Sequence, residues 1–113
     1  MIDGLLAALV LVSPRSGLYG KVVIDPARPI CVAGVSCSAP DANDLLTFVR
    51  RGRRVATTRT RIDGTFRIAL APGRYAVRAR RAGAIGRGLE PAHALVPRAR
   101  YARVNFTLDL GIR

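Results

Sequence analysis

The chain of 113 residues has the length of one domain, and a hydrophobic content of 50% excludes an intrinsically disordered protein. Its 19 basic and 7 acidic residues give a net charge of +12, which favours polyanionic partners such as nucleic acid or acidic envelope polymers. Lys21 is the single lysine, however, so arginine supplies almost all of the positive charge, as in proteins encoded by GC-rich genomes. Both interpretations of the charge stay open.

Residues 1–14 differ from the rest of the chain because they contain an apolar run at residues 5–12. This run is too short to span a bilayer, which takes about 20 residues. Its length suits the hydrophobic region of a secretory signal peptide, but no basic residue precedes it and Asp3 has the wrong charge. We expect either a signal peptide with a truncated start or an apolar arm, followed by a single domain over residues 15–113.

Beyond this run, apolar and polar residues alternate with a period of two, which is typical of β-strands. Residues 18–24 predict the first strand, and Pro26 ends it. Residues 45–50 and 54–60 predict two further strands, joined by a hairpin turn at Gly52. No amphipathic helix of useful length is predicted.

The chain has two cysteines, Cys31 and Cys37, which lie close together in the sequence. They fit one local disulfide, which implies an oxidising compartment, although a pair of reduced, partly buried thiols is the alternative. A disulfide requires the chain to bend at residues 32–35, where Gly34 accepts a positive φ. His93 is the one further candidate ligand of the zinc-binding type, so we predict no metal site.

Two turn signals bound the clearest strands of the sequence. Asp63-Gly64 and Pro72-Gly73 predict tight turns before residues 65–70 and 74–80, both of which alternate apolar and polar residues. We predict that these strands form a β-meander with an apolar inner face and an arginine-rich outer face. The arginines expected together on that outer face, as candidate contacts to a polyanion, are Arg67, Arg74, Arg78 and Arg80.

The C-terminal third predicts a long surface connection and then a final strand. Residues 81–97 form the connection, with a short strand at residues 94–96. Residues 102–110 show the most regular alternation in the chain and predict one uninterrupted strand. The total of about seven strands, with frequent turn signals, favours a sandwich or barrel of antiparallel strands.

The segment T-R-I-D-G-T-F at residues 60–66, followed by L-A-P-G-R-Y at residues 70–75, resembles the carboxypeptidase regulatory-like family. The resemblance covers approximately residues 18–110, but only residues 60–75 are specific. It implies an all-β, antiparallel, seven-stranded β-sandwich of the Ig-like or prealbumin-like (transthyretin-like) kind, as in small bacterial secreted members. The family often has Asp at the position of Arg61, so the resemblance implies no calcium site here. The residues that match the family's signature are Asp63, Gly64, Phe66, Leu70, Pro72, Gly73 and Tyr75.

No arrangement of residues predicts catalysis. A Ser-His-Asp triad would have to use His93, and no G-x-S-x-G motif accompanies it. Asp41 and Asp44 lie in a turn-rich loop, where aspartate is favoured because it hydrogen-bonds its own backbone. We therefore predict no catalytic residues and no cofactor.

The sequence predicts a non-catalytic structural or interaction module of the bacterial cell envelope or exterior, which packs against another protein or an envelope polymer. The alternative is an arginine-rich protein that binds a polyanion, either nucleic acid or an acidic envelope polymer. Scarce aromatic side chains argue against nucleic acid, because Tyr19 and Tyr101 are the only candidates for stacking.

Overall fold

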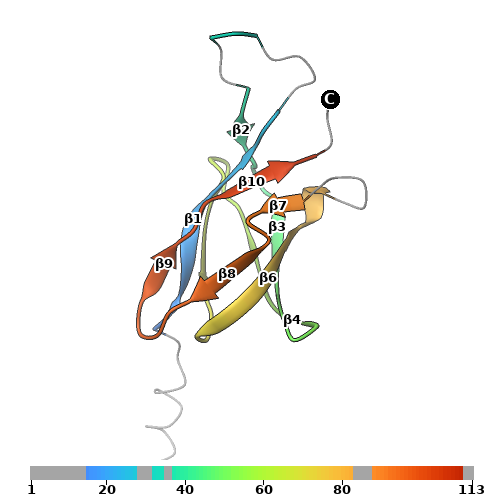
Figure 1. Ribbon diagram of the computed structural model, residues 1–113. Coiled ribbons are helices and arrows are strands. Elements are labelled where there is room, and N and C mark those ends of the chain that lie inside the picture. Colours follow the sequence, from blue (N-terminus) through green and yellow to red (C-terminus); the bar gives the residue numbers. More distant parts are fainter. Residues whose placement is uncertain (1–14, 28–31, 35–36, 83–87, 111–113) are drawn as a thin grey trace, which may run out of the picture.

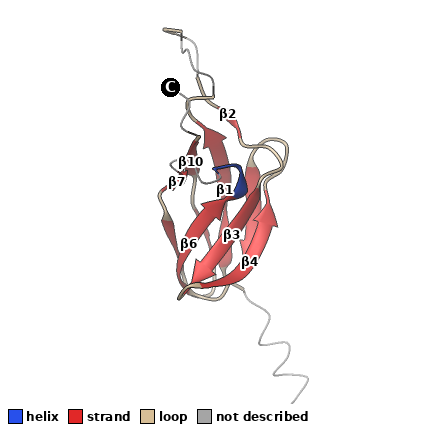
Figure 2. Ribbon diagram, turned by 90° about the vertical axis from the view of Figure 1, so that its right-hand side faces the viewer, coloured by secondary structure: helices blue, strands red, loops and turns tan. Residues whose placement is uncertain are grey.

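A computed structural model describes residues 15–27, 32–34, 37–82 and 88–110, and these form two β-sheets that enclose one apolar core (Figures 1 and 2). One sheet contains β1, β2, β5, β7, β9 and β10, and the other follows the order β4-β3-β6-β8. The residues described contain no helix long and apolar enough to cross a membrane. The elements are β1 (Gly17–Ile24), β2 (Ala39–Pro40), β3 (Leu45–Arg50), β4 (Arg53–Arg59), β5 (Thr65–Ala69), β6 (Gly73–Ala79), the 3-10 turn η1 (Arg80–Ala82), β7 (Gly88–Glu90), β8 (His93–Val96), β9 (Tyr101–Arg103) and β10 (Phe106–Asp109).

Strand β1 is the centre of the six-stranded sheet, because each of its halves has two neighbours. Its first half pairs antiparallel with β5 and parallel with β9, and its second half pairs antiparallel with β2 and parallel with β10. The prediction of a purely antiparallel fold is therefore wrong, since this sheet is mixed. The all-β fold and the two packed sheets are confirmed.

The uninterrupted final strand predicted at residues 102–110 is also wrong, because the structure divides it into β9 and β10. Opposite the break lies Gly20, where an added Cβ would come within 1.7 Å of the Val104 carbonyl oxygen. The backbone N–H of Lys21 donates to the side-chain Oδ1 of Asn105 at 3.1 Å instead of to a strand carbonyl. A side-chain amide thus supplies an acceptor to β1 where the strand pairing is interrupted.

The four-stranded sheet begins with the predicted β3–β4 hairpin. Arg51 and Gly52 form its turn with φ values of 53° and 77°, and two consecutive positive φ values match the twist of an antiparallel hairpin. A register shift between Phe48 and Val49 adds an irregularity to the same pair of strands. β6 pairs with β3 on its other side, and β8 forms the far edge of the sheet.

Strands β5 and β6 do not form the predicted meander. β5 pairs with β1 in one sheet, whereas β6 pairs with β3 and β8 in the other. The Pro72-Gly73 turn therefore carries the chain from one sheet to the other. As a consequence Arg67 lies on a different sheet from Arg74 and Arg78, and the predicted common arginine face is wrong.

The predicted alternation of buried and exposed side chains is confirmed in the strands that build the core. Phe66 contacts an aromatic ring of each sheet, with ring centroids 6.5 Å from Phe48 and 5.8 Å from Phe106. Tilted ring pairs at these separations add favourable electrostatics to the burial of apolar surface. The buried apolar residues are Leu18, Val22, Leu46, Phe48, Phe66, Ile68, Leu70, Tyr75, Val77, Ala79, Leu89, Ala94, Val96, Phe106 and Leu108.

Two glycines with positive φ offer a matched test of how the fold uses the turn before β5. Gly64 has a φ of 85°, and an added Cβ would lie 2.5 Å from the carbonyl oxygen of Val22. Gly52 has a φ of 77°, but nothing lies within 4 Å of its Cβ position. We expect Gly52→Ala to lower the free energy of unfolding by about 1 kcal/mol through backbone strain alone. Gly64→Ala should cost about 2 kcal/mol more, because it also forces two buried segments apart.

Chemical denaturation of both variants measures this difference. Equal losses of stability would show that the contact between Gly64 and β1 does not constrain the fold.

Candidate functional site

The Asp63-Gly64 turn is built from its own side-chain and backbone hydrogen bonds. The carboxylate of Asp63 accepts from the backbone N–H of Thr65 at 3.0 Å and from its hydroxyl at 2.6 Å, and these bonds lower the pKa of Asp63. The Gly64 carbonyl in turn accepts from the backbone N–H of Val22. The turn therefore fixes β5 against β1, which explains the signature residues as structural elements.

The second half of the signature forms a corner between the sheets. Tyr75 is 1% exposed, and its hydroxyl donates to the carbonyl of Ala71 at 2.7 Å. The guanidinium of Arg50 lies 5.7 Å from the centre of the Tyr75 ring and donates to the carbonyl of Pro72. A side chain at Gly73 would collide with this guanidinium, since an added Cβ would lie 2.8 Å from its Cζ. Leu70 is buried beneath the corner.

Cys37 is not a free cysteine, but Cys31 lies outside the described residues. The Cys31–Cys37 disulfide therefore stays a prediction. The predicted bend between them is confirmed at Gly34, which has a φ of 81° within a turn. Residues 1–14 also lie outside the described part of the chain.

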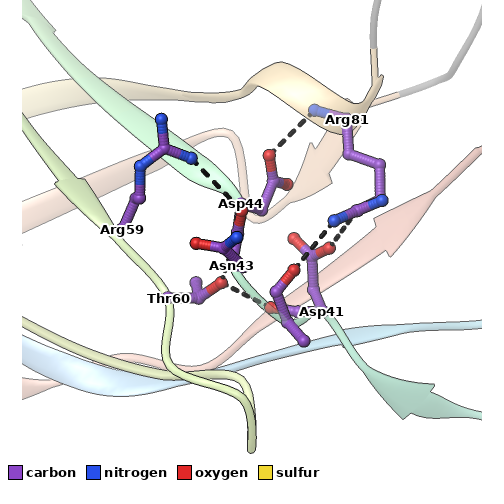
Figure 3. A network of polar contacts seen from close by, with 7 residues as sticks. Asp41, Asn43, Asp44, Arg59, Thr60 and Arg81 are labelled. Carbon is purple, nitrogen blue, oxygen red and sulfur yellow. Dashed lines mark hydrogen bonds and ion pairs between the residues drawn. The ribbon is translucent and has the colours of Figure 1, made fainter.

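The most unusual chemical feature is a pair of buried carboxylates in the loop between β2 and β3. Asp41 is 0% exposed and Asp44 is 3% exposed, and they flank a turn that includes Asn43 with a φ of 56° (Figure 3). Burying a carboxylate is costly unless it is paired or hydrogen-bonded. Both residues were expected in a turn, and they do lie beside one, but turn formation does not explain their burial.

Arg81 of η1 connects this loop to the end of β6. Its side-chain Nε lies 2.7 Å from Oδ1 of Asp41, and its Nη2 donates to the carbonyl of Ala42 at 2.8 Å. Its backbone N–H donates to Oδ1 of Asp44 at 2.9 Å. One residue thus satisfies one oxygen of each carboxylate, and it holds η1 against the loop.

Thr60, the first residue of the signature segment, holds the same loop through hydrogen bonds. Its hydroxyl donates to the carbonyl of Asp41 at 2.5 Å and accepts from the backbone N–H of Asp44 at 2.8 Å. Two backbone bonds, from Asn43 N–H to the Thr60 carbonyl and from Thr60 N–H to the Asp44 carbonyl, complete the link. The threonine therefore needs its hydroxyl both as donor and as acceptor.

The second oxygen of each carboxylate, Oδ2, is buried and has no hydrogen-bond partner among the described residues. Two ionised carboxylates beside one guanidinium would leave a net negative charge in the interior. Burial, followed by hydrogen bonding to Asp44 and the charge of Asp44, raises the pKa of Asp41 to about 7, although Arg81 acts in the opposite direction. A single proton shared by the pair neutralises the cluster.

This cluster does not resemble a metal centre. The described residues contain no group of three or more His, Cys, Asp or Glu side chains that could hold a metal ion. The adjacent hollow of about 340 Å³ is lined by Arg59, Arg80 and Arg81, whose charges repel a cation. Through Arg81, the pair links the β2–β3 loop to η1.

A groove of about 730 Å³ lies on the outer face of the four-stranded sheet, which Figure 2 turns towards the viewer. Its floor is apolar and comes from Leu45 and Val49 of β3 and Ala76 of β6. Arg54, Arg78 and Arg80 line it, so the structure brings together two of the four arginines predicted as one set, Arg78 and Arg80. The described residues that line it are Leu45, Thr47, Val49, Gly52, Arg54, Ala76, Val77, Arg78, Ala79, Arg80, Ala82, Gly88, Leu89, Ala92 and His93, and none of these is acidic.

His93 lies on this groove. It pairs in register with Ala76, and its side chain is exposed on the outer face of β8.

In comparisons with known proteins, no family model matches the chain, and no curated protein is significantly similar to it.

The shared proton of the acidic pair makes stability depend on pH. The unfolded chain loses this proton near the ordinary pKa of 3.8, whereas the folded chain keeps it to about 7. Protons are therefore bound more tightly by the folded state, so its stability falls as the pH rises between these values. We expect the free energy of unfolding to decrease by about 2 kcal/mol from pH 5 to pH 8, measured by urea denaturation.

The variant Asp41→Asn should abolish most of this dependence, because its amide does not titrate and is neutral at every pH. Asp63→Asn is the matched control, since Asp63 is exposed with a lowered pKa and stays ionised over this range. A wild-type stability that is flat or rises from pH 5 to pH 8 would contradict the shared proton.

Proposed function

We propose that this protein is a non-catalytic structural or interaction module of the bacterial cell envelope or exterior, of the carboxypeptidase regulatory-like kind. The observation that carries the proposal is that the signature residues at positions 60–75 have structural tasks. Asp63 and Gly64 form a turn against β1, and Pro72, Gly73 and Tyr75 form the corner between the sheets. The segment that most resembles the family therefore builds a scaffold, and interactions are left to the outer faces of the sheets.

The mixed six-stranded sheet is compatible with a prealbumin-like or Ig-like arrangement without requiring it. The strands predicted to form a seven-stranded sandwich correspond to β1, β3, β4, β5, β6, β8 and the combined β9 and β10. The short strands β2 and β7 extend the edges of the larger sheet. We include the seven-stranded topology in the proposal on this correspondence.

The groove on the four-stranded sheet is the surface that suits a partner protein. Its volume of about 730 Å³ falls in the range of ligand-binding clefts, and its apolar floor offers contact area that water leaves readily. Leu95 and Val55 add exposed apolar surface on the same sheet, being 69% and 51% exposed. Because Arg54, Arg78 and Arg80 line the groove and none of its described lining residues is acidic, the partner should present acidic side chains beside apolar ones.

Photocrosslinking in the source cell tests this surface directly. A photoreactive amino acid in place of Val49, on the floor of the groove, should give a protein adduct of defined mass. The matched control is the same replacement at Thr107, which is exposed on β10 of the other sheet. Adducts of equal yield at both positions, or none at Val49, would contradict a docking groove.

The alternative function, binding of a polyanion, is favoured by the three arginines around one hollow. It predicts strong retention on heparin, with a log affinity that falls steeply with log salt. The double variant Arg54→Gln/Arg78→Gln should then elute at much lower salt than Arg98→Gln/Arg100→Gln, which removes the same charge from an exposed connection. The interaction module predicts weak retention and similar elution of the two double variants.

The proposed location outside the cytoplasm is tested by the cysteines. Protein recovered from its native compartment should gain the mass of two hydrogens on reduction, as expected for a Cys31–Cys37 disulfide. Free thiols in freshly isolated protein, detected by alkylation before reduction, would contradict an oxidising location.

A further inference from the structure

The outer face of the six-stranded sheet carries a second basic surface, on the opposite side of the core from the groove. We call it the tyrosine–arginine face and define it by Tyr19 and Lys21 of β1, Arg67 of β5, and Tyr101 and Arg103 of β9. These side chains belong to three neighbouring strands, with β1 in the middle. The two tyrosines are far apart in the sequence, and the pairing of β1 with β9 brings them onto one face.

The strand register places Tyr19 between two arginine residues. Tyr19 pairs with Arg67 across β5 and with Arg103 across β9. Neighbouring strands are about 4.8 Å apart, so the three residues occupy adjacent positions in one row across the sheet. Tyr19 is 39% exposed, and both arginines are exposed.

The next row of the face fixes the position of Arg67. Gly17 pairs with Tyr101, and an added Cβ at Gly17 would lie 2.5 Å from Cε2 of the tyrosine ring, so the glycine makes room for this ring. The guanidinium of Arg67 lies over the Tyr101 ring with its Cζ 3.9 Å from the ring centre. A stacked arginine has lost much of its conformational freedom before a ligand arrives, which lowers the cost of binding.

The arginines of this face keep their charges available. Neither Arg67 nor Arg103 forms an ion pair with another described residue. Among the described residues, the ion pair that the structure shows joins Arg81 to Asp41. Asp63 is near Lys21, whose charge helps to lower the pKa of Asp63, but its carboxylate is already bonded to Thr65. The face therefore attracts anions, most strongly beside Tyr19.

We propose that the tyrosine–arginine face binds an acidic polysaccharide, with a sugar ring on Tyr19 and the carboxylates of the polymer on Arg67 and Arg103. A uronic-acid polymer offers a ring and a carboxylate in every unit, and a guanidinium can bind a carboxylate through two parallel hydrogen bonds. Single-stranded nucleic acid fits less well, because it stacks successive bases on several open aromatic rings, whereas Tyr101 is covered by Arg67. This site goes beyond the proposed docking groove and is independent of it.

Titration with polygalacturonate oligomers, followed by the intrinsic fluorescence of the tyrosines in a protein without tryptophan, tests the proposal. Tyr19→Ala leaves the charge unchanged and should weaken binding about fivefold or more, the contribution expected of one aromatic contact. Tyr19→Phe keeps the ring and should bind within about twofold of the wild type. Calorimetry should give the same ranking, which separates the loss of binding from the loss of a fluorophore.

Charge is tested by Arg103→Gln against Arg98→Gln, which removes the same charge from the exposed β8–β9 connection. Only Arg103→Gln should weaken binding by more than the general effect of one charge. The groove variant Arg54→Gln/Arg78→Gln should bind like the Arg98→Gln/Arg100→Gln control, so a failure of the docking groove does not affect this outcome.

Three results would overturn the proposal: no binding of polygalacturonate, an affinity that Tyr19→Ala leaves intact, or tighter binding of an oligo-dT strand that depends on Tyr19. The last result would identify single-stranded nucleic acid as the occupant.

Discussion

The fold depends on strand β1 having a neighbouring strand on both sides in each of its halves. Gly17 and Gly20 make this possible. A side chain at Gly17 would collide with Ile68 of β5 and Tyr101 of β9, and a side chain at Gly20 would collide with the carbonyl of Val104 between β9 and β10. Gly20 shares the inner face of the strand with Leu18 and Val22, which lie in the core at 1% and 0% exposure, whereas Gly17 is on the outer face. One glycine on each face, with apolar residues on the inner face, thus allows a single strand to organise both the larger sheet and one wall of the core.

Side-chain alternation could be predicted from the sequence because it has a period of two in any sheet, whichever strands are paired. Phe66, Tyr75 and Phe106 are buried as predicted. Strand pairing could not be predicted in the same way, because Pro72-Gly73 is an equally good signal for a hairpin and for a crossing between sheets. Two contacts hold the chain where it passes from one sheet to the other: the Tyr75 hydroxyl donates to the carbonyl of Ala71, and Arg50 packs over the Tyr75 ring. Both contacts form only in the folded chain, so the sequence alone does not reveal them.

The acidic pair shows a different limit of sequence analysis. Aspartate in a turn-rich loop is common, and nothing local distinguishes Asp41 and Asp44 from exposed turn residues. Their burial comes from Thr60 and Arg81, which are distant in sequence and meet the loop only in the folded chain. Thr60 is the first residue of the family-like segment, so this segment and the buried pair form one connected structure. Its first residue hydrogen-bonds to the loop that contains the carboxylates, and its turn at Gly64 lies against β1.

The distribution of arginine is the feature that most changes the functional interpretation. A single outer face with Arg67, Arg74, Arg78 and Arg80 would have suited one polyanion. The structure instead separates Arg67 from the other three and gives each side of the core a different chemistry: an apolar groove lined by arginine on one sheet, and an aromatic row flanked by arginine on the other. The first suits a protein surface and the second suits a charged polymer of rings. A rigid module with two such faces on opposite sides can hold a protein against an acidic polymer, and no catalytic group is needed for that task.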